Sequence, residues 1–320
     1  MSGVITIKSN NTILNYIKIP NTGHLKTGTD YGKNGVDGYI KNKHGPDGAL
    51  FLDPHLDDFL RKTQNKKVLD IGCGVGPCSI QAALYGAEKV IGFDIQELMI
   101  IEGQKLIRDK GLADRVTLMV GDASQMPSKD EFFHAAISVC VACNLPNGIF
   151  EKHFQELARV LNQEGEALII APTSLNVLFT DGTEETHVLE CIHEVLAQLP
   201  LFPKTDLINE TFKQLPQVLS ATFAQNEQGK LFLVRDLNEI KEGQQIWRKL
   251  PFVTVPNFYH SDASYLKELQ DANLKIDRIV KHHFVNEDQR QKFNEENPLT
   301  PLGKAYIDHP PFALYYVKKD

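Results

Sequence analysis

Three aspartates and a run of glycines are the residues whose types and spacing could carry chemistry. Asp70 ends an apolar run two residues before Gly72, and glycines recur at positions 74 and 76. Glycine adopts backbone angles that other residues resist, and it lets a ligand approach the main chain closely. Asp94 and Asp122 close the next two apolar runs along the chain. We therefore expect a ligand-binding turn over 72–76 with carboxylates around it.

The spacing of the glycines bears on which ligand the turn binds. A dinucleotide-binding fingerprint, GxGxxG, would need its third glycine at position 77, which is Pro77. The observed pattern is GxGxG, and it follows the carboxylate of Asp70. A pyrophosphate gains nothing from a carboxylate there, whereas a ligand with an ammonium and a sulfonium group does. The turn thus favours S-adenosylmethionine (SAM) over NAD.

The two later aspartates fit the remaining parts of such a ligand. Asp94 lies about 22 residues beyond Gly72, where a carboxylate can accept hydrogen bonds from both ribose hydroxyls. SAM and NAD share that ribose, so Asp94 does not separate them. Asp122 is placed to accept from the adenine amine, with the Ala123 N–H beside it. Any one of these acids could simply cap a strand, but acids at the carboxyl ends of three successive strands favour a ligand site.

Alternating elements must position these residues. Apolar runs of strand length are nearly continuous, as expected for a parallel sheet covered by helices on both faces. Helical patterns lie between them, over 96–111 and 149–161. The alternation predicts a doubly wound α/β fold. The predicted strands are Lys67–Gly72, Lys89–Ile95, Arg115–Asp122, Ala135–Ala142 and Glu166–Pro172.

The alternation breaks over 173–261, where prolines are frequent. This segment is predicted to be a mostly helical insertion, with helices over 185–198 and 209–223 and a strand near 231–237. A helix over 261–273 and strands over 275–284 and 311–319 then bring the strand total to seven. The predicted organisation is an N-terminal lid (1–50), an α/β core (51–172), a substrate-capping insertion (173–261) and completion of the core (262–320).

Five stretches together resemble one known family. VLDIGCGVGPCSI, GFDI, GDASQMP, ISVCVACNLPN and ELARVLNQEGEALII are similar to class I, Rossmann-like SAM-dependent methyltransferases of the small-molecule type, over roughly residues 50 to 172. The resemblance implies a seven-stranded sheet with the last strand antiparallel. It also implies SAM contacts at the turn and at the strand ends, with Met126 packed near adenine. The predicted cofactor-binding residues are Asp70, Gly72, Gly74, Asp94, Ile95, Asp122, Ala123, Cys140 and Tyr31.

Two positions depart from the family pattern. The fourth strand usually opens with Phe-Asp, but here it reads Phe133-His134, at the end away from the chemistry. Its far end, usually a His-His or similar pair before Leu-Pro, reads Cys143-Asn144. We expect Asn144 to face the cofactor or the methyl acceptor without acting as a base. The Asn-Pro-Pro-Tyr signature of amine methylation on DNA or protein is absent.

The acceptor side is less defined by the sequence. The candidate catalytic residues are His187, Tyr259 and His260, since His is the usual base near neutral pH. For each histidine, a structural role explains the sequence better than a catalytic one. Trp247 and Tyr39 are predicted to bind substrate, although Trp247 could instead anchor the insertion. Tyr31 and Tyr39 could belong to a lid over the cofactor or to a loop on the sheet edge.

Charge and composition bear on the partners. The net charge of −7 and the pI near 5.9 argue against nucleic acid, which usually requires a basic face. No apolar run reaches the ~20 residues that span a bilayer, and the N-terminus does not have a signal-peptide pattern. Five cysteines, mostly in apolar segments, suit reduced thiols in the cytoplasm. A metal site is predicted neither at Cys140-x-x-Cys143 nor at the His187–Cys191 pair.

The resulting prediction is methyl transfer from SAM to O or N of a small organic molecule by in-line displacement. The insertion and the N-terminal segment would cap the acceptor pocket, and the sequence is compatible with a homodimer. Two alternatives stay open: methylation of a protein side chain, and a catalytically silent SAM-binding or interaction protein that keeps the fold.

Overall fold

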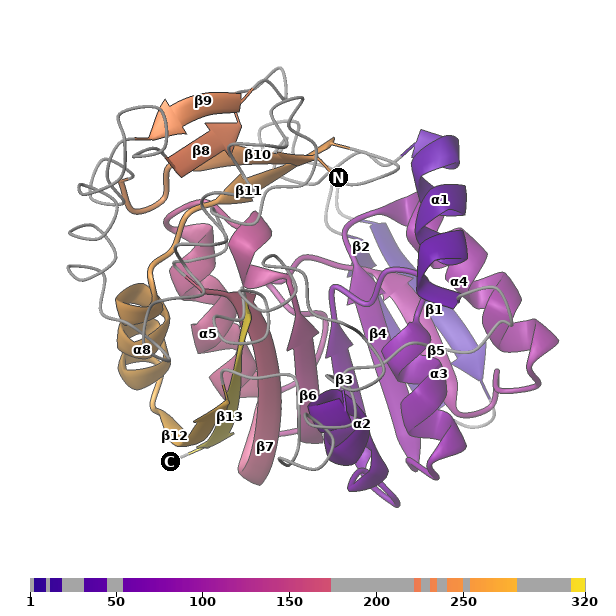
Figure 1. The fold of residues 1–320 in the computed structure, drawn as a ribbon. Helices are drawn as coiled ribbons and strands as arrows, with labels where there is room; N and C mark the ends of the chain where they lie inside the picture. Colours follow the sequence, from indigo (N-terminus) through magenta and orange to yellow (C-terminus); the bar gives the residue numbers. More distant parts are fainter. Residues whose placement is uncertain are drawn as a thin grey trace, which may run out of the picture.

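A seven-stranded sheet forms the centre of the computed structural model (Figure 1). The structure describes residues 3–9, 12–18, 32–44, 54–173, 222–225, 231–234, 241–249, 254–280 and 312–319. The strand order in the sheet is β12-β13-β7-β6-β3-β4-β5. Its strands are β3 (Lys67–Ile71), β4 (Lys89–Asp94), β5 (Val116–Val120), β6 (Phe133–Val139), β7 (Leu161–Pro172), β12 (Leu274–Val280) and β13 (Phe312–Lys319).

The pairing of the strands confirms the predicted sheet. The five strands from β5 to β7 are mutually parallel, and β13 is antiparallel to both of its neighbours, β7 and β12. The chain builds outward from β3 to β4 and β5, then crosses back to place β6 on the other side of β3. Open α/β sheets bind ligands outside the carboxyl ends of the strands at such a reversal. The fold therefore points to the β3/β6 junction.

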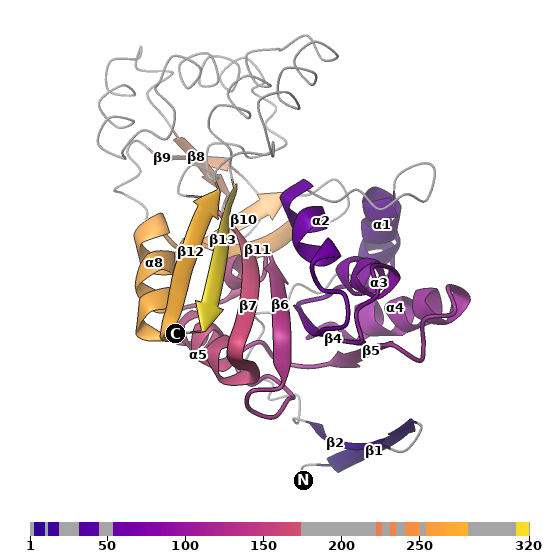
Figure 2. The same cartoon turned by 90° about the horizontal axis from the view of Figure 1, so that it is seen from below.

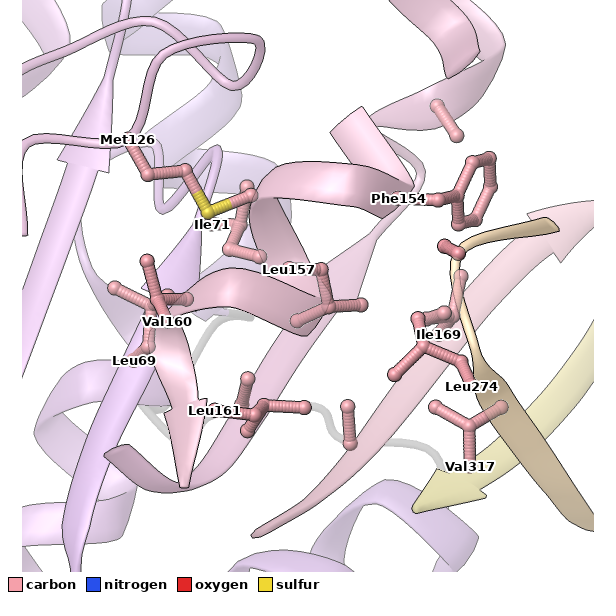
Figure 3. Packing of buried hydrophobic residues seen from close by; sticks show 14 of the residues in the cluster. Leu69, Ile71, Met126, Phe154, Leu157, Val160, Leu161, Ile169, Leu274 and Val317 are labelled. Atoms are coloured by element: carbon pink, nitrogen blue, oxygen red, sulfur yellow. The ribbon is translucent and has the colours of Figure 1, made fainter. Parts of the chain in front are cut away.

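Helices cover both faces of the sheet (Figure 2). On one face, α5 (Ile149–Val160) and α8 (Asp262–Asp271) bury residues such as Phe154 and Tyr265. On the other, α2 (Pro54–Arg61), α3 (Pro77–Leu84) and α4 (Glu97–Asp109) pack over a second apolar cluster. Successive residues of β3 join opposite clusters, since side chains alternate along a strand. Figure 3 shows the first cluster, in which α5 side chains meet those of β3, β7, β12 and β13.

Two segments differ from the sequence prediction within or beside the core. The strand predicted over 135–142 ends at Val139, because Cys140 takes a left-handed conformation with φ of 55°. A short 3-10 helix, η1 (Ala142–Asn144), follows it. The glycine-rich segment before the core, predicted as a loop or lid, contains the helix α1 (Gly32–His44). Val36 of α1 is buried in a small apolar cluster with Val75 and Met99.

The described part of the insertion consists of strands. β8 (Thr222–Gln225) pairs with β9 (Leu231–Val234), and β10 (Gln245–Lys249) pairs with β11 (Thr254–Phe258), both antiparallel. These strands lie beyond the carboxyl ends of β6 and β7 (Figure 1). The predicted helix over 185–198 falls outside the described residues. The one predicted over 209–223 does too, except for its last two residues, which begin β8.

One further strand pair precedes the core. β1 (Gly3–Ser9) and β2 (Thr12–Lys18) form an antiparallel pair that the sequence analysis did not predict. In the described part of the chain, no helix is both long and apolar enough to cross a membrane.

Candidate cofactor-binding site

The glycine turn after β3 has the conformation that its sequence predicts. Gly72, Gly74 and Gly76 have φ of 61°, 55° and 82°, a region that other L-residues rarely adopt. Space is also short at Gly72, since an added Cβ would lie 2.5 Å from Cγ2 of Val141. At Gly74 an added Cβ would lie 3.1 Å from the hydroxyl oxygen of Tyr39. The backbone angles therefore favour glycine at both positions, and at Gly72 the packing of Val141 excludes a larger residue as well.

Asp94 joins this turn to the end of the neighbouring strand β4. Its Oδ2 accepts from the Gly74 N–H at 2.9 Å, and its Oδ1 accepts from the Gln96 N–H at 2.9 Å. Burial raises the pKa of the Asp94 carboxyl, and these backbone N–H groups oppose that shift. Each carboxylate oxygen has a second lone pair. Asp94 can thus fix the turn and still accept a hydroxyl at each oxygen, as the ribose prediction requires.

Asp70 caps the helix that follows the turn. Its Oδ2 accepts from the Ser79 N–H at 3.0 Å and from the Ser79 hydroxyl at 2.6 Å, at the start of α3. A carboxylate at a helix N-terminus satisfies a free N–H and interacts favourably with the helix dipole. Burial raises the pKa of Asp70 to about 7. This capping role was not predicted from the sequence, and direct contact between Asp70 and the cofactor stays a prediction.

Asp122 and Ala123 lie in a turn after β5. Oδ1 of Asp122 accepts from the N–H and the hydroxyl of Ser124, both at 2.8 Å, which fixes the carboxylate in the turn. The buried imidazole of His153, from α5, lies between this turn and the end of β6, where its Nε2 is 3.3 Å from the Ser138 hydroxyl oxygen. Burial lowers the pKa of His153 to about 4, so the ring is neutral. The position of His153 beside these residues was not predicted from the sequence.

The remaining predicted cofactor residues have mixed surroundings. Ile95 is 44% exposed beside Asp94, as a side chain that packs on a planar ring could be. Met126, in contrast, is buried within the core cluster (Figure 3). Cys140 stands at the end of β6, beside the Val141 that touches Gly72. Tyr31 lies outside the described residues. Cofactor contact by each of these residues stays a prediction.

Asn144 is held on both sides. Its Nδ2 donates to the Cys140 carbonyl at 2.6 Å, and its Oδ1 accepts from Nδ2 of Asn257 at 2.6 Å. Asn257 belongs to β11 of the insertion and is buried. It also approaches Sγ of Cys143, at 3.8 Å. The insertion is therefore attached directly to η1, just after the end of β6. The family resemblance implies that this end of β6 faces the methyl group.

His260 and Tyr259 are buried at the same junction. Nε2 of His260 donates to the Leu145 carbonyl at 2.8 Å, and its ring stacks on Phe150 with centroids 3.7 Å apart. Burial lowers the pKa of His260, which favours the neutral ring with a lone pair on Nδ1. Nδ1 has no hydrogen-bond partner among the described residues. Tyr259 pairs through its backbone with Gln244 and Gly243. Catalysis by either residue stays a prediction.

The other acceptor-side predictions are only partly placed. Tyr39, predicted to bind substrate, lies on α1 with its hydroxyl beside Gly74, so the structure places it at the cofactor turn. Trp247 lies on β10, but its side chain falls outside the description, and His187 falls outside altogether. Among the described residues, no disulfide joins Cys140 to Cys143.

SAM fits the group of residues gathered here. No Cβ projects from the three left-handed glycines of the turn, so a ligand can approach the main chain at these positions. Asp94 offers two oxygens at the end of β4, and Asp122 follows the end of β5, the order in which the ribose and adenine of one ligand would meet them.

The segment that contains the glycine turn is similar to known methyltransferases. Residues 68–165 match the family model described as "Methyltransferase domain". The chain is 28% identical over 135 residues to "Sterol 4-C-methyltransferase strm-1" of Caenorhabditis elegans, a match covering 42% of this chain and 40% of that protein. It is 35% identical over 117 residues to "Squalene methyltransferase 1" of Botryococcus braunii, covering 36% and 30%. The matches thus span well under half the length of either relative.

A solved structure shares the fold. The "S-adenosylmethionine dependent methyltransferase" from Mesorhizobium loti superposes with a TM-score of 0.52 at 16% identity, covering 83% of this chain and 96% of that one. Together with the strand order, this confirms the predicted fold class. Residues 68–165 match a methyltransferase domain, and the sheet around them has the class I, Rossmann-like order of strands.

Proposed function

We propose that the whole chain is a SAM-dependent methyltransferase that acts on a small organic molecule. The observation that carries the proposal is the junction of the glycine turn with Asp94, where Gly74 donates to the carboxylate. This contact prearranges the turn and the ribose-binding group in one rigid unit, at the place where open α/β sheets bind ligands.

Bound SAM would supply an activated methyl group, so the chain's own task is alignment and exclusion of water. The turn over 72–76 and the acids at the strand ends would bind the cofactor. Asn144, at the end of β6, would face the cofactor or the acceptor, since one of its amide hydrogens and one lone pair are not used in the bonds to Cys140 and Asn257.

The position of the insertion supports a small acceptor. β11 and the residues just after it are attached to η1 and to Leu145 through Asn257 and His260. Chain segments over the carboxyl ends of β6 and β7 would enclose a small ligand and leave little room for a polymer (Figure 1). A small molecule is thus the partner that we propose, in preference to a protein side chain or nucleic acid.

The methyl acceptor is proposed to be O or N, and carbon is the second candidate. The relatives named above are a sterol C-methyltransferase and a squalene methyltransferase, but those matches cover less than half of either protein. Nδ1 of His260 is the candidate proton acceptor that we retain among the described residues, because Nε2 is already committed to Leu145.

Two measurements test the proposal. Titration calorimetry should give binding of S-adenosylhomocysteine (SAH) and none of NADH, and the reverse would overturn the cofactor assignment. Incubation with radiolabelled SAM should transfer label to at least one member of a panel of small alcohols, phenols, amines and alkenes, and not to an unfractionated protein extract. Label in protein alone would favour the side-chain alternative, and tight SAH binding without any transfer would favour a silent SAM-binding protein.

A further inference from the structure

The methyl-facing end of β6 depends on an unusual backbone conformation. Cys140 has φ of 55°, a conformation that a non-glycine residue rarely adopts unless its surroundings hold it there. Its N–H donates to the Ile170 carbonyl at 2.8 Å, and its carbonyl accepts from Asn144 Nδ2 at 2.6 Å and from Cys143 Sγ at 3.4 Å. These contacts fix the direction of the chain after β6.

That direction matters for the cofactor turn. The residue after Cys140 is Val141, whose Cγ2 occupies the space where a Cβ of Gly72 would be. A change at Cys140 therefore moves the side chain that packs directly on the first glycine of the turn. The end of β6 and the turn after β3 are one packed unit.

The insertion contacts this unit through the side chain of Asn257. Asn257 donates to Oδ1 of Asn144, and Asn144 donates to the Cys140 carbonyl. The two contacts agree on the amide orientation of Asn144: turning it over would place oxygen against the Cys140 carbonyl and nitrogen against the Asn257 amide nitrogen. Asn257 thus selects the orientation in which Asn144 supports Cys140.

We propose that Asn257 is a positioning residue for the cofactor site, acting through Asn144 on the backbone at Cys140. The proposal rests on the proposed function for the identity of the cofactor. It means that docking of the β10–β11 pair and cofactor binding stabilise each other, because both depend on the same conformation of Cys140. Such coupling is reciprocal.

The test measures SAH affinity by titration calorimetry, with the thermal midpoint measured alongside. Asn257→Ala should weaken SAH binding about tenfold at unchanged stoichiometry, because a buried hydrogen bond contributes about 1.4 kcal/mol. Asn257→Asp keeps the shape and replaces the donor by an acceptor facing Oδ1 of Asn144, so it should weaken binding at least as much. This second variant serves if the alanine variant does not fold.

Glu242→Ala, in the turn just before β10, is the matched control. The Glu242 carboxylate accepts from the Ser261 N–H at 3.1 and 3.2 Å, so it anchors the pair without touching η1. This variant should lower the thermal midpoint and leave SAH affinity within twofold of wild type. An equal loss of affinity in Glu242→Ala and Asn257→Ala would overturn the proposal, because loosening the strand pair would then suffice.

A double-mutant cycle separates positioning from a general structural role. In an Asn144→Ala background, Asn257→Ala should have little further effect on SAH affinity. Additive losses, or wild-type affinity in Asn257→Ala, would overturn the proposal while leaving the cofactor assignment intact. Failure of the wild-type protein itself to bind SAH would instead overturn the proposed function on which it rests.

Discussion

Gly72 offers a substitution whose cost can be worked from the structure in two parts. The first is backbone strain, because alanine at φ of 61° costs roughly 1–2 kcal/mol. The second is steric, because the new Cβ would lie 2.5 Å from Cγ2 of Val141, and overpacking of this kind costs about 1–3 kcal/mol. Gly72→Ala should therefore lower the free energy of unfolding by about 2–5 kcal/mol.

Two further variants separate the cost of backbone strain from the cost of the steric clash. Gly111→Ala is the control for strain alone, since Gly111 has φ of 67° and nothing lies within 4 Å of an added Cβ. It should cost roughly 1–2 kcal/mol. Val141→Ala removes the atoms that clash, so combining it with Gly72→Ala should recover about 1–3 kcal/mol relative to the sum of the single effects.

Urea denaturation of the four variants and wild type provides the stabilities, and SAH titration reports the site. The coupling between positions 72 and 141 should match the excess cost of Gly72→Ala over Gly111→Ala. Gly72→Ala should also weaken SAH binding, because relief of the clash moves the turn or the end of β6. The packing argument would be refuted if Gly72→Ala were no more destabilising than Gly111→Ala. It would also be refuted if adding Val141→Ala to Gly72→Ala recovered no stability.

Three other predictions concern carboxylates and a buried imidazole. Asp94→Ala should weaken SAH binding more than tenfold, since charge-assisted bonds contribute about 1.5–3 kcal/mol; unchanged affinity in calorimetry would contradict the assignment. The pKa of His153 is lowered to about 4, so the imidazole of the unfolded chain is protonated first as pH falls. The free energy of unfolding should therefore decrease by on the order of 3 kcal/mol as pH falls from about 6.5 to 4. His153→Gln should flatten that dependence in urea titrations at several pH values; an unchanged slope would show that the ring is not buried neutral. The pKa of Asp70 is raised to about 7, so its effect on the free energy of unfolding has the opposite sign, and stability decreases as pH rises from about 4 to 7. Asp70→Asn should remove this decrease, which is on the order of 4 kcal/mol. A difference between wild type and Asp70→Asn that does not vary with pH would count against this.

The sequence determined the core of the fold because its signals are local. Nearly continuous apolar runs predicted the strands from β3 to β7 and β13, and the family resemblance implied that the last strand is antiparallel. The left-handed glycines of the turn were predictable because only glycine adopts those angles without strain. The prediction that Asp94 lies beside the turn followed from the rule that parallel strands present their carboxyl ends at one edge.

Local signals were weaker where tertiary packing decides the conformation. The glycines of α1 predicted a loop, yet residues 32–44 are helical, with the buried Val36 packed against Val75 and Met99. The apolar run through Val141 predicted a longer strand. The strand ends at Val139 because contacts to Ile170 and Asn144 hold Cys140 at positive φ.

Only the tertiary structure decided which distant residues share the site. Asn257 and Asn144 are 113 positions apart, and nothing in the periodicity of either segment predicts their hydrogen bond. His153 looked like one more residue on the apolar face of a helix, but the fold places it beside Ser138 at the end of β6. The physical reason is that such contacts depend on the directions in which whole elements pack, whereas the turn over 72–76 depends on the angles of its own residues.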